Sequence, residues 1–419
     1  MRLTMFTGPY PVGEMLGGIG LRLWELANTL ADEGIEVIMA CPPGSDPSWS
    51  RPGVQVRLFD ETGWPHLVAQ TDGVLTTDLP DARVLLHAYQ LGKVLISENS
   101  PPIEHLDYHR ILVSTDPQGL YDDLVARYLL QAWTSDHFVV RSSVERAGML
   151  GTLVGIGRLS PAQHARSRAL SHLLTLLPIG FTTRAAEIAD AAPPTCTPTE
   201  FVWNGGIWNY YDTNVLLRAL RDMRAAGRPG RIRFLYGPPV DQHIAEADRL
   251  LEQVNRPDLR DIVIYPDEPL PHTARDGVVK SSRVLVCLGR DGAENHTCHR
   301  LRLRDALLYR LPVVIDAHGA SGDWVRQLGI GLAVDTGDPQ EVTDAMNRLA
   351  FDQTAYDRCR AAIERVRPAH TYEANVSSLL AFLGAGNRAL DAASPRQKTA
   401  VAGLLRRRPT LTATPLNPI

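Results

Sequence analysis

One stretch in the second half of the chain concentrates side chains that carry charge or form hydrogen bonds. Within the twelve residues from 294 to 305 lie Glu294, His296, His299, Arg300, Arg302 and Asp305. Carboxylates accept hydrogen bonds from sugar hydroxyls, and guanidinium groups bind diphosphates through paired N–H donors. On a helix beginning near residue 297, one stripe would carry Cys298, Arg302, Asp305 and Tyr309. The stretch therefore predicts a sugar-nucleotide site, or else a solvated helix face with an Arg302–Asp305 ion pair.

The same stretch raises the question of a metal site. His296 and His299 could both bind a metal ion through their imidazole nitrogens, and Glu294 or Cys298 would be a third ligand. The spacing of these residues matches no standard zinc pattern, and no second ligand cluster accompanies them. The sequence therefore predicts no metal site and no cofactor.

Two glycine pairs follow strand-like runs, one in each half of the chain. Gly17 and Gly18 lie in EMLGGIG, and Gly205 and Gly206 lie in WNGGIWNYYD. Glycine lets the backbone approach a ligand closely, and a following helix N-terminus offers unpaired N–H groups. Each pair also fits a tight strand-to-helix turn. Trp208 fits either stacking on a sugar or base, or cover for the sheet edge.

Strand-like and helix-like segments alternate and must position these residues. In the first half, strands are expected at 2–8, 35–43, 82–89, 92–99, 109–116 and 136–143. In the second half, they are expected at 200–205, 231–237, 261–267, 282–289, 311–316 and 330–336. Short apolar runs between helices indicate parallel sheets that are covered on both faces. The fold class is therefore α/β, with two doubly wound Rossmann-like domains that face a cleft.

Composition shifts set the expected domain boundaries. Residues 1–188 form an N-terminal acceptor-side domain, and the Pro-rich segment 189–199 is the linker. Residues 200–365 form a C-terminal nucleotide-sugar-binding domain. A helix over 366–385 crosses back to the first domain, and residues 386–419 are a mobile tail.

Charge and composition limit the classes of function. The 419-residue chain has a formal net charge of -4 from 43 basic and 47 acidic residues, so it lacks the positive excess of a nucleic-acid-binding protein. Its five cysteines form no CxxC pair, which fits a reducing cytoplasm. No signal peptide and no apolar run of membrane-spanning length is expected. The basic residues 406–408 leave weak peripheral contact with a membrane open.

Three motifs in order resemble the GT-B glycosyltransferases, and more narrowly the retaining group classed as family 4. WNGGIWNYYD resembles a WGGGIWDWFD loop of a bacterial subset in polysaccharide and secondary-metabolite pathways, and residues 142–158 match a second stretch. Glu294, Arg300, Arg302 and Asp305 precede LPVV as in that subset. The resemblance runs from about residue 8 to residue 380.

The resemblance implies roles for these residues. Glu294 approaches the donor sugar, and Asp305 holds the ribose hydroxyls. Gly205 and Gly206 leave room for the donor diphosphate, beside Trp208. Gly17 and Gly18 lie near the diphosphate and the acceptor. His87 and Glu98 are candidates for acceptor-side work, although His87 more readily fits a structural role.

Two departures from the family pattern affect the expected activity. The common family has two Glu eight residues apart at the carboxylate positions, and it has Arg and Lys where this chain has Gly205 and Tyr210. Arg300 and Arg302 are the natural replacement cations, with Arg290 in reserve. The resemblance implies a retaining hexosyl-type transferase that moves a sugar from a nucleotide-sugar donor to a hydroxyl of a small-molecule or glycan acceptor. The alternatives are a non-catalytic sugar-nucleotide-binding partner of another transferase and a pseudo-glycosyl coupling enzyme of the same fold.

Overall fold

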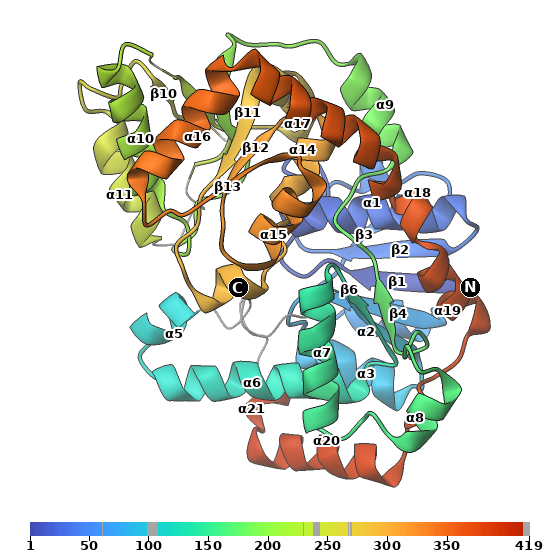
Figure 1. The fold of residues 1–419 in the computed structure, drawn as a ribbon. Helices are drawn as coiled ribbons and strands as arrows, with labels where there is room; N and C mark the ends of the chain where they lie inside the picture. The colour runs from blue at the N-terminus through green and yellow to red at the C-terminus, as the bar shows by residue number, and fades with distance from the viewer. Residues whose placement is uncertain are drawn as a thin grey trace. The chain divides into compact units, whose positions relative to one another are not determined.

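The chain folds into two compact units, each built on a parallel sheet (Figure 1). A computed structural model describes residues 1–60, 62–98, 108–228, 230–237, 244–266, 268 and 270–413. Unit 1 combines residues 1–178 with 372–419, and unit 2 is the continuous segment 179–371. The predicted class of two Rossmann-like α/β domains is confirmed.

Unit 1 holds a seven-stranded parallel sheet in the order β3-β2-β1-β4-β5-β6-β7. Its strands are β1 (Arg2–Phe6), β2 (Glu36–Cys41), β3 (Val54–Leu58), β4 (Gly73–Thr77), β5 (Val94–Glu98), β6 (His137–Val140) and β7 (Leu174–Leu176). Strands β1, β2, β4, β5 and β6 are buried along almost their whole length, as expected of a sheet with helices on both faces.

The helices of unit 1 come from both ends of the chain. They are α1 (Gly18–Asp32), α2 (Trp64–Ala69), α3 (Ala82–Gln90), α5 (Tyr108–Val113), α6 (Pro117–Thr134), α7 (Ser143–Gly155), α8 (Pro161–Arg166), α18 (Tyr372–Asn375), α19 (Ser377–Ala385), α20 (Pro395–Arg407) and α21 (Thr410–Ala413). A 3-10 turn, η1, spans Pro47–Trp49.

Two of the strands predicted in the first half are helices. Residues 82–89 belong to α3, and residues 109–113 belong to α5. The Asp81 side chain caps α3 by accepting a hydrogen bond from the Arg83 backbone N–H, which favours a helix start. The apolar run of α3 is therefore the buried side of a helix, as length and periodicity alone did not reveal.

Unit 2 holds a six-stranded parallel sheet in the order β10-β9-β8-β11-β12-β13. Its strands are β8 (Thr199–Trp203), β9 (Ile232–Phe234), β10 (Val263–Ile264), β11 (Ser282–Cys287), β12 (Val313–Asp316) and β13 (Gly331–Val334). Each lies within a segment predicted as a strand, except that β8 begins one residue earlier. The strand order reverses between β8 and β11, which makes the carboxyl ends of these strands the switch point of the sheet.

The helices of unit 2 connect these parallel strands. They are α9 (Thr183–Ala191), α10 (Thr213–Ala225), α11 (Ala245–Val254), α12 (Arg275–Lys280), α13 (Ala293–Thr297), α14 (Arg304–Leu308), α15 (Gly319–Leu328), α16 (Pro339–Phe351) and α17 (Gln353–Val366). Short 3-10 turns lie at η2 (His272–Ala274), η3 (Leu301–Leu303) and η4 (Arg367–His370).

The chain passes from unit 1 to unit 2 earlier than the Pro-rich segment suggests. The passage lies between Pro178 and Ile179. Ile179 and Phe181 are already buried in the core of unit 2, and Ala189 of α9 is buried there too. Backbone bonds such as Thr195 N–H to Gly277 O tie the segment 189–199 to unit 2. This segment is therefore part of unit 2, and the expected linker at 189–199 is not the passage between the units.

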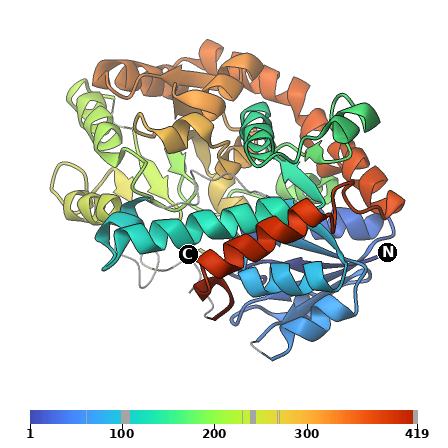
Figure 2. The ribbon, with the colours of Figure 1, turned by 90° about the horizontal axis from the view of Figure 1, so that it is seen from below.

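Residues 372–413 belong to unit 1, and those from 386 onward differ from the expected mobile tail. The last residues of that expected tail, 414–419, lie outside the described part of the chain. The expected helix over 366–385 is two short helices, α18 and α19, which belong to unit 1. Helix α20 follows and lies alongside α6 (Figure 2). It buries Val401 and Leu404, whereas Arg408 pairs with two acidic residues of α6. Apolar burial on one helix face outweighs the polar composition that suggested disorder.

A buried ion pair in unit 1 lies where the chain enters and leaves that unit. Arg22 of α1 pairs with Glu98 at the end of β5 at 2.6 Å, and both side chains are buried. The same guanidinium donates to the carbonyl oxygens of Leu177 at 2.8 Å and Pro178 at 3.0 Å, and to the Tyr372 hydroxyl at 3.4 Å. Glu98 is therefore committed to an internal pair and is not an acceptor-side base.

His87 likewise has a structural position. It lies on α3 and packs edge-on against Trp64, with ring centroids 5.5 Å apart.

Among the described residues, no helix is long and apolar enough to cross a membrane.

Candidate functional site

The glycine loop after β8 meets the charged stretch after β11 at the carboxyl edge of the unit 2 sheet. Asn204, the first residue after β8, joins them. Its side-chain NH₂ donates to the Asp305 carboxylate at 2.6 Å and to the Arg302 carbonyl at 2.9 Å. The structure thus brings together Gly205, Gly206, Arg302 and Asp305, which the sequence had placed about a hundred residues apart.

Arg302 lies directly under the glycine loop. Its Nη2 donates to the Gly206 carbonyl at 2.6 Å, and its guanidinium carbon lies 4.3 Å from the centre of the Tyr211 ring. A Cβ on Gly205 would approach that guanidinium carbon to 2.7 Å. Glycine at 205 therefore leaves the space that the arginine occupies, which explains why the loop and the cation are found together.

Asp305 is buried and surrounded by donors. Arg275 of α12 and Arg304 both pair with it, the latter at 3.2 Å. Burial would lower the pKa of Arg275, but the Asp305 carboxylate together with the Tyr236 and Tyr309 hydroxyls raises it above its ordinary value. Both carboxylate oxygens of Asp305 are thus occupied by the protein itself.

Burial beside this cluster, more than its positive charge, lowers the pKa of the nearby His272. Desolvation is the first cause that lowers its pKa to about 4, and the charges of Arg275 and Arg304 add to it. The cluster of Asp305 with Arg275, Arg304 and Asn204 is called here the Asp305 cluster. It is a buried, hydrogen-bonded group in the interior of unit 2 in which two guanidinium groups share one carboxylate.

Arg300 does not occupy the position predicted for a phosphate clamp. It forms a two-pronged pair with Asp316 at the end of β12, with Nη1–Oδ1 at 2.5 Å and Nη2–Oδ2 at 3.0 Å. Both side chains are buried. Nη2 also donates to the Asn295 side chain at 2.5 Å. Arg300 therefore holds the loop after β11 to the end of β12. Its predicted catalytic role stays a prediction, and it would require this buried pair to open.

The helix expected from residue 297 is broken, which separates the members of the predicted stripe. Helix α13 ends at Thr297, and Cys298 and Arg300 have extended backbones before η3 and α14. The extended step turns Arg300 toward Asp316, whereas Arg302 lies under the glycine loop. The i,i+3 pair of Arg302 with Asp305 is replaced by the bond from Asn204.

The other predicted residues have different surroundings. Glu294 is half-buried at the start of α13, and among the described residues its carboxylate has no hydrogen-bonding or ionic partner. Trp208 is 37% exposed, with its indole lying over Gly206. In unit 1, Gly17 precedes α1, and Gly18 has a φ of 51° with open space around its Cα. These four residues thus stay available to a ligand.

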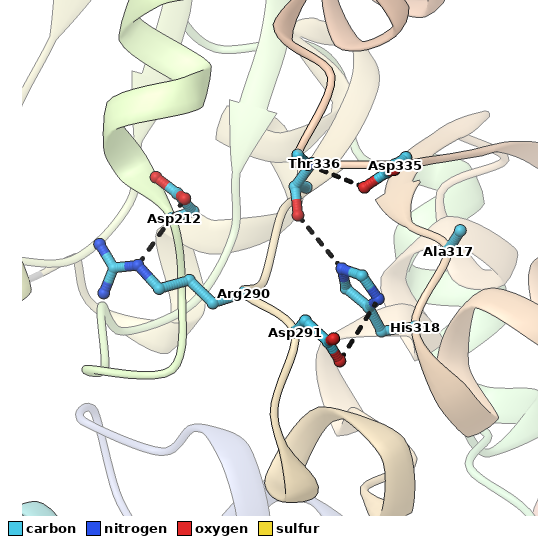
Figure 3. A pocket seen from close by; sticks show the side chains of 8 residues that line it. Asp212, Arg290, Asp291, Ala317, His318, Asp335 and Thr336 are labelled. Carbon is cyan, nitrogen blue, oxygen red and sulfur yellow. Dashed lines mark hydrogen bonds and ion pairs between the residues drawn. The ribbon is translucent and has the colours of Figure 1, made fainter.

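A separate cavity of about 600 Å³ opens at the carboxyl ends of β11, β12 and β13 (Figure 3). Its lining consists of Asp212, Arg290, Asp291, Ala317, His318, Asp335, Thr336 and Gly337. Arg290 is the one cation of permanent charge among them, and it is held by Glu246 at 2.6 Å. Three carboxylates against one guanidinium make this lining acidic, so it suits hydroxyl groups or a cation better than a bare anion.

Two of the cavity residues, Asp291 and His318, were not selected from the sequence. His296, which was, donates from Nε2 to Asp291 Oδ1 at 2.7 Å, and this bond lowers the pKa of the Asp291 carboxyl. His318 Nδ1 lies 3.8 Å from the same oxygen. His299 instead packs edge-on against Trp324. Of Asp291, His296 and His318, the sequence analysis selected only His296. It grouped His296 with His299, which the structure places against Trp324 instead.

The missed residues share one property. Arg275, Asn204, Asp291 and His318 come from four different segments, and only Asn204 lies in a motif described above, the WNGGIWNYYD loop. The signal that was present is positional, because three of the four stand within a few residues of a strand's carboxyl end. Ligands of open parallel sheets bind at that edge.

Comparisons with known proteins establish the fold. No protein-family model and no curated protein sequence matches the chain. The sucrose-phosphate synthase of Thermosynechococcus elongatus is similar with a TM-score of 0.59 and 16% identity, over 92% of this chain and 100% of that one. The trehalose 6-phosphate synthase of Burkholderia multivorans gives 0.59 and 14%, over 92% and 98%. HepE from Anabaena, in complex with UDP-glucose, gives 0.60 and 12%, over 92% and 99%.

These similarities define the class of fold. Each match covers 92% of this chain. The chain therefore has the GT-B fold, as its motifs predicted. Sequence identities of 12–16% are too low to infer the substrates of this chain from those of the similar structures.

Proposed function

We propose that this chain is a retaining glycosyltransferase of hexosyl type that transfers a sugar from a nucleotide sugar to a hydroxyl of a small-molecule or glycan acceptor. The observation that carries the proposal is the meeting of the glycine loop with Arg302 and Asp305 at the switch point of unit 2. Proteins of similar fold include one in complex with UDP-glucose, which supports a nucleotide-sugar donor.

In this proposal the leaving diphosphate gains charge as the anomeric bond breaks, and fixed donors stabilise it. Arg302 is the best candidate for a donor to the diphosphate, because it lies beside the glycine loop and its buried Nη1 has no hydrogen-bond partner among the described residues. Backbone N–H groups beside Gly205 and Gly206 add to it. An oxygen of the leaving phosphate takes the acceptor's proton, so this chemistry requires no metal.

Glu294 is proposed to bind the donor sugar. Its half-buried carboxylate accepts no hydrogen bond from the described residues, so it is free to accept bonds from hexose hydroxyls. Trp208 is proposed to stack on the donor beside Gly206. Gly17 and Gly18 are proposed to admit the diphosphate and the acceptor, since a backbone without Cβ atoms leaves room there.

The second candidate is a non-catalytic sugar-nucleotide-binding partner of another transferase. The observation that favours it is the commitment of Arg300 to Asp316, which leaves one fewer cation for the diphosphate than the sequence suggested. The two candidates differ in turnover and not in binding.

Measuring the binding and hydrolysis of a panel of UDP-, GDP-, ADP- and dTDP-sugars tests the transferase and the non-catalytic candidate together. We expect one donor class to bind and to be hydrolysed slowly, and Glu294→Gln to lower this turnover by at least about 100-fold with little loss of binding to the nucleotide alone. Glu252→Gln, which changes an exposed carboxylate on α11, is the matched control. Binding without turnover, even when candidate acceptors are added, would favour the second candidate. No binding of any nucleotide sugar would overturn both.

A further inference from the structure

Two imidazoles and one carboxylate meet at the edge of the unit 2 cavity. One ligand atom from each of Asp291, His296 and His318 lies within 4.8 Å of the others. Two histidines and a carboxylate form a ligand set for Zn²⁺ and for other divalent transition metals. We propose that these three residues bind one such cation, with an open coordination position that faces the cavity.

Hydrogen bonding gives His318 the tautomer that a metal ligand needs. The Thr336 hydroxyl donates its single proton to the Gly289 carbonyl at 2.9 Å. The same hydroxyl oxygen lies 3.2 Å from His318 Nε2, so this nitrogen must be the donor in that bond. The neutral imidazole therefore carries its proton on Nε2 and a lone pair on Nδ1. A hydrogen bond from the far nitrogen to a fixed oxygen is how metal-binding histidines are oriented.

The lone pair on Nδ1 faces a negative group. Nδ1 lies 3.8 Å from Asp291 Oδ1, which already accepts a hydrogen bond from His296. A carboxylate oxygen and an unprotonated nitrogen repel one another unless a positive charge lies between them. Ligands around one zinc ion at about 2.0–2.2 Å are about 3.4 Å apart, close to the observed separation.

The other two ligands can adjust to a bound ion. The side chains of His296 and Asp291 are 55% and 73% exposed. Rotation of either side chain opens their direct bond without a packing cost. His296 then binds through Nε2, and its proton moves to Nδ1 by exchange with solvent.

The backbone brings the two histidines together. Gly319, which follows His318, has a φ of 59°, and a Cβ there would lie 2.3 Å from the His296 Cα. Only glycine permits this approach of α15 to α13. The Arg300–Asp316 pair and its bond to Asn295 fix the same two segments from inside. The site is therefore placed by the buried frame of unit 2.

The open position follows from the lining of the cavity. Asp291 and His318 face it, as Figure 3 shows, whereas His296 completes the site from outside the lining. Three protein ligands leave a fourth position of a tetrahedral ion for water or for an anionic oxygen. This inference concerns binding of the cation and does not depend on the proposed transfer reaction.

Co²⁺ titration of the full chain tests the site, with visible absorption and isothermal calorimetry as readouts. We expect one Co²⁺ per chain with the intense d–d bands of a four- or five-coordinate ion. Zn²⁺ should displace it. His318→Ala should weaken binding by more than about tenfold, whereas the exposed histidine variant His164→Ala in unit 1 should leave it unchanged. Binding that is absent, or that is equal in these two variants, would overturn the proposal.

Thr336 is a positioning residue, and its variants separate orientation from folding. Thr336→Val keeps the side-chain volume but removes the acceptor for His318 Nε2–H, and we expect Co²⁺ to bind about 10- to 100-fold more weakly. Thr336→Ser should restore both the affinity and the spectrum. If Val and Ser variants bind alike, the tautomer argument is wrong.

Inorganic pyrophosphate tests the open position. Its addition to the Co²⁺-loaded chain should shift the d–d bands, because a phosphate oxygen replaces the bound water. An unchanged spectrum at saturating pyrophosphate would contradict the open position. This result does not depend on any sugar nucleotide, so failure of the proposed transferase activity would leave it intact.

Discussion

The interior and the rim of unit 2 use charged residues in opposite ways. In the interior, Arg300 with Asp316 and Arg275 with Asp305 are buried and paired through several bonds. At the rim, Asp291 and His296 are more than half exposed, and Glu294 has no partner among the described residues. Along the chain the rim residues 291–296 lie between Arg275 and Arg300, so both groups come from one stretch of sequence. The difference teaches that charge density in a sequence marks a site only where the fold leaves the charge unsatisfied.

The largest expected effect comes from breaking an interior pair. Arg300→Met leaves the Asp316 carboxylate buried without its partner, and we expect the free energy of unfolding to fall by about 3–5 kcal/mol. Chemical denaturation measures it. Asp291→Asn at the rim should change it by less than about 0.5 kcal/mol. Similar values for the two variants would contradict the distinction between interior and rim.

The second effect is on pH dependence. The pKa of His272 beside the Asp305 cluster is lowered to about 4, below the ordinary value of 6.5. As pH falls from about 6.5 toward 4, the unfolded chain binds a proton there that the folded chain does not, so stability is lost over that window by at most about 3 kcal/mol. Below pH 4 this loss ends. Stability measured from pH 7 to 4.5 should become less steep in His272→Gln.

The matched variant for this test is His296→Gln at the rim. Its imidazole is exposed and adjoins a carboxylate, so removing it should not reduce the loss of stability on acidification. A shallower slope in His296→Gln and an unchanged slope in His272→Gln would reverse the comparison.

A smaller effect is expected where the interior meets the glycine loop. Gly205→Ala places a Cβ 2.7 Å from the guanidinium carbon of Arg302 and displaces that flexible side chain. The lost bond to Gly206 should cost about 1 kcal/mol. In Gly206→Ala the new Cβ meets the Trp208 indole at 3.4 Å, an ordinary contact. That variant should keep the stability of the parent, and thermal unfolding of both compares them.

The smallest effect on stability is expected for Trp208→Ala. Its side chain is 37% exposed, so the free energy of unfolding should change by less than about 0.5 kcal/mol. If the indole stacks on the donor as proposed, nucleotide-sugar binding should weaken by about tenfold. Trp208→Phe should retain most of the affinity. Equal nucleotide-sugar affinity in the parent, Trp208→Ala and Trp208→Phe would show that Trp208 does not contact the donor.

The sequence predicted the sheet of unit 2 better than that of unit 1. Every strand of unit 2 lies at a predicted segment, because each is a short apolar run between clear turns or helices. In unit 1, β3, β4 and β7 were not predicted, and 82–89 was placed in a strand. Strand β3 is a partly exposed edge strand, and β7 has only three residues. Short apolar runs do not distinguish such elements from one side of a helix.

The site was predicted in part, for a physical reason. The meeting of Gly205, Arg302 and Asp305 followed from motif order. The fate of Arg300 did not, because a helix was assumed from Thr297 onward. The extended backbone at Cys298 and Arg300 depends on Asp316 and Ser321, which lie on other elements. Residues paired only by tertiary contacts leave no local signal.

The discontinuity of unit 1 has a consequence for the order of folding during synthesis. Helices α18, α19 and α20 complete the packing of this unit, and they are made after the whole of unit 2. Unit 2 is continuous and can close as soon as residue 371 has emerged. At ribosomal rates of about 5–20 residues per second, the first 178 residues wait about 10–50 s for their missing helices. Unit 1 is thus the later one to finish, because its seven strands are made early but lack the cover of α18, α19 and α20 until then. This uncovered stage is the one at which chaperones would act.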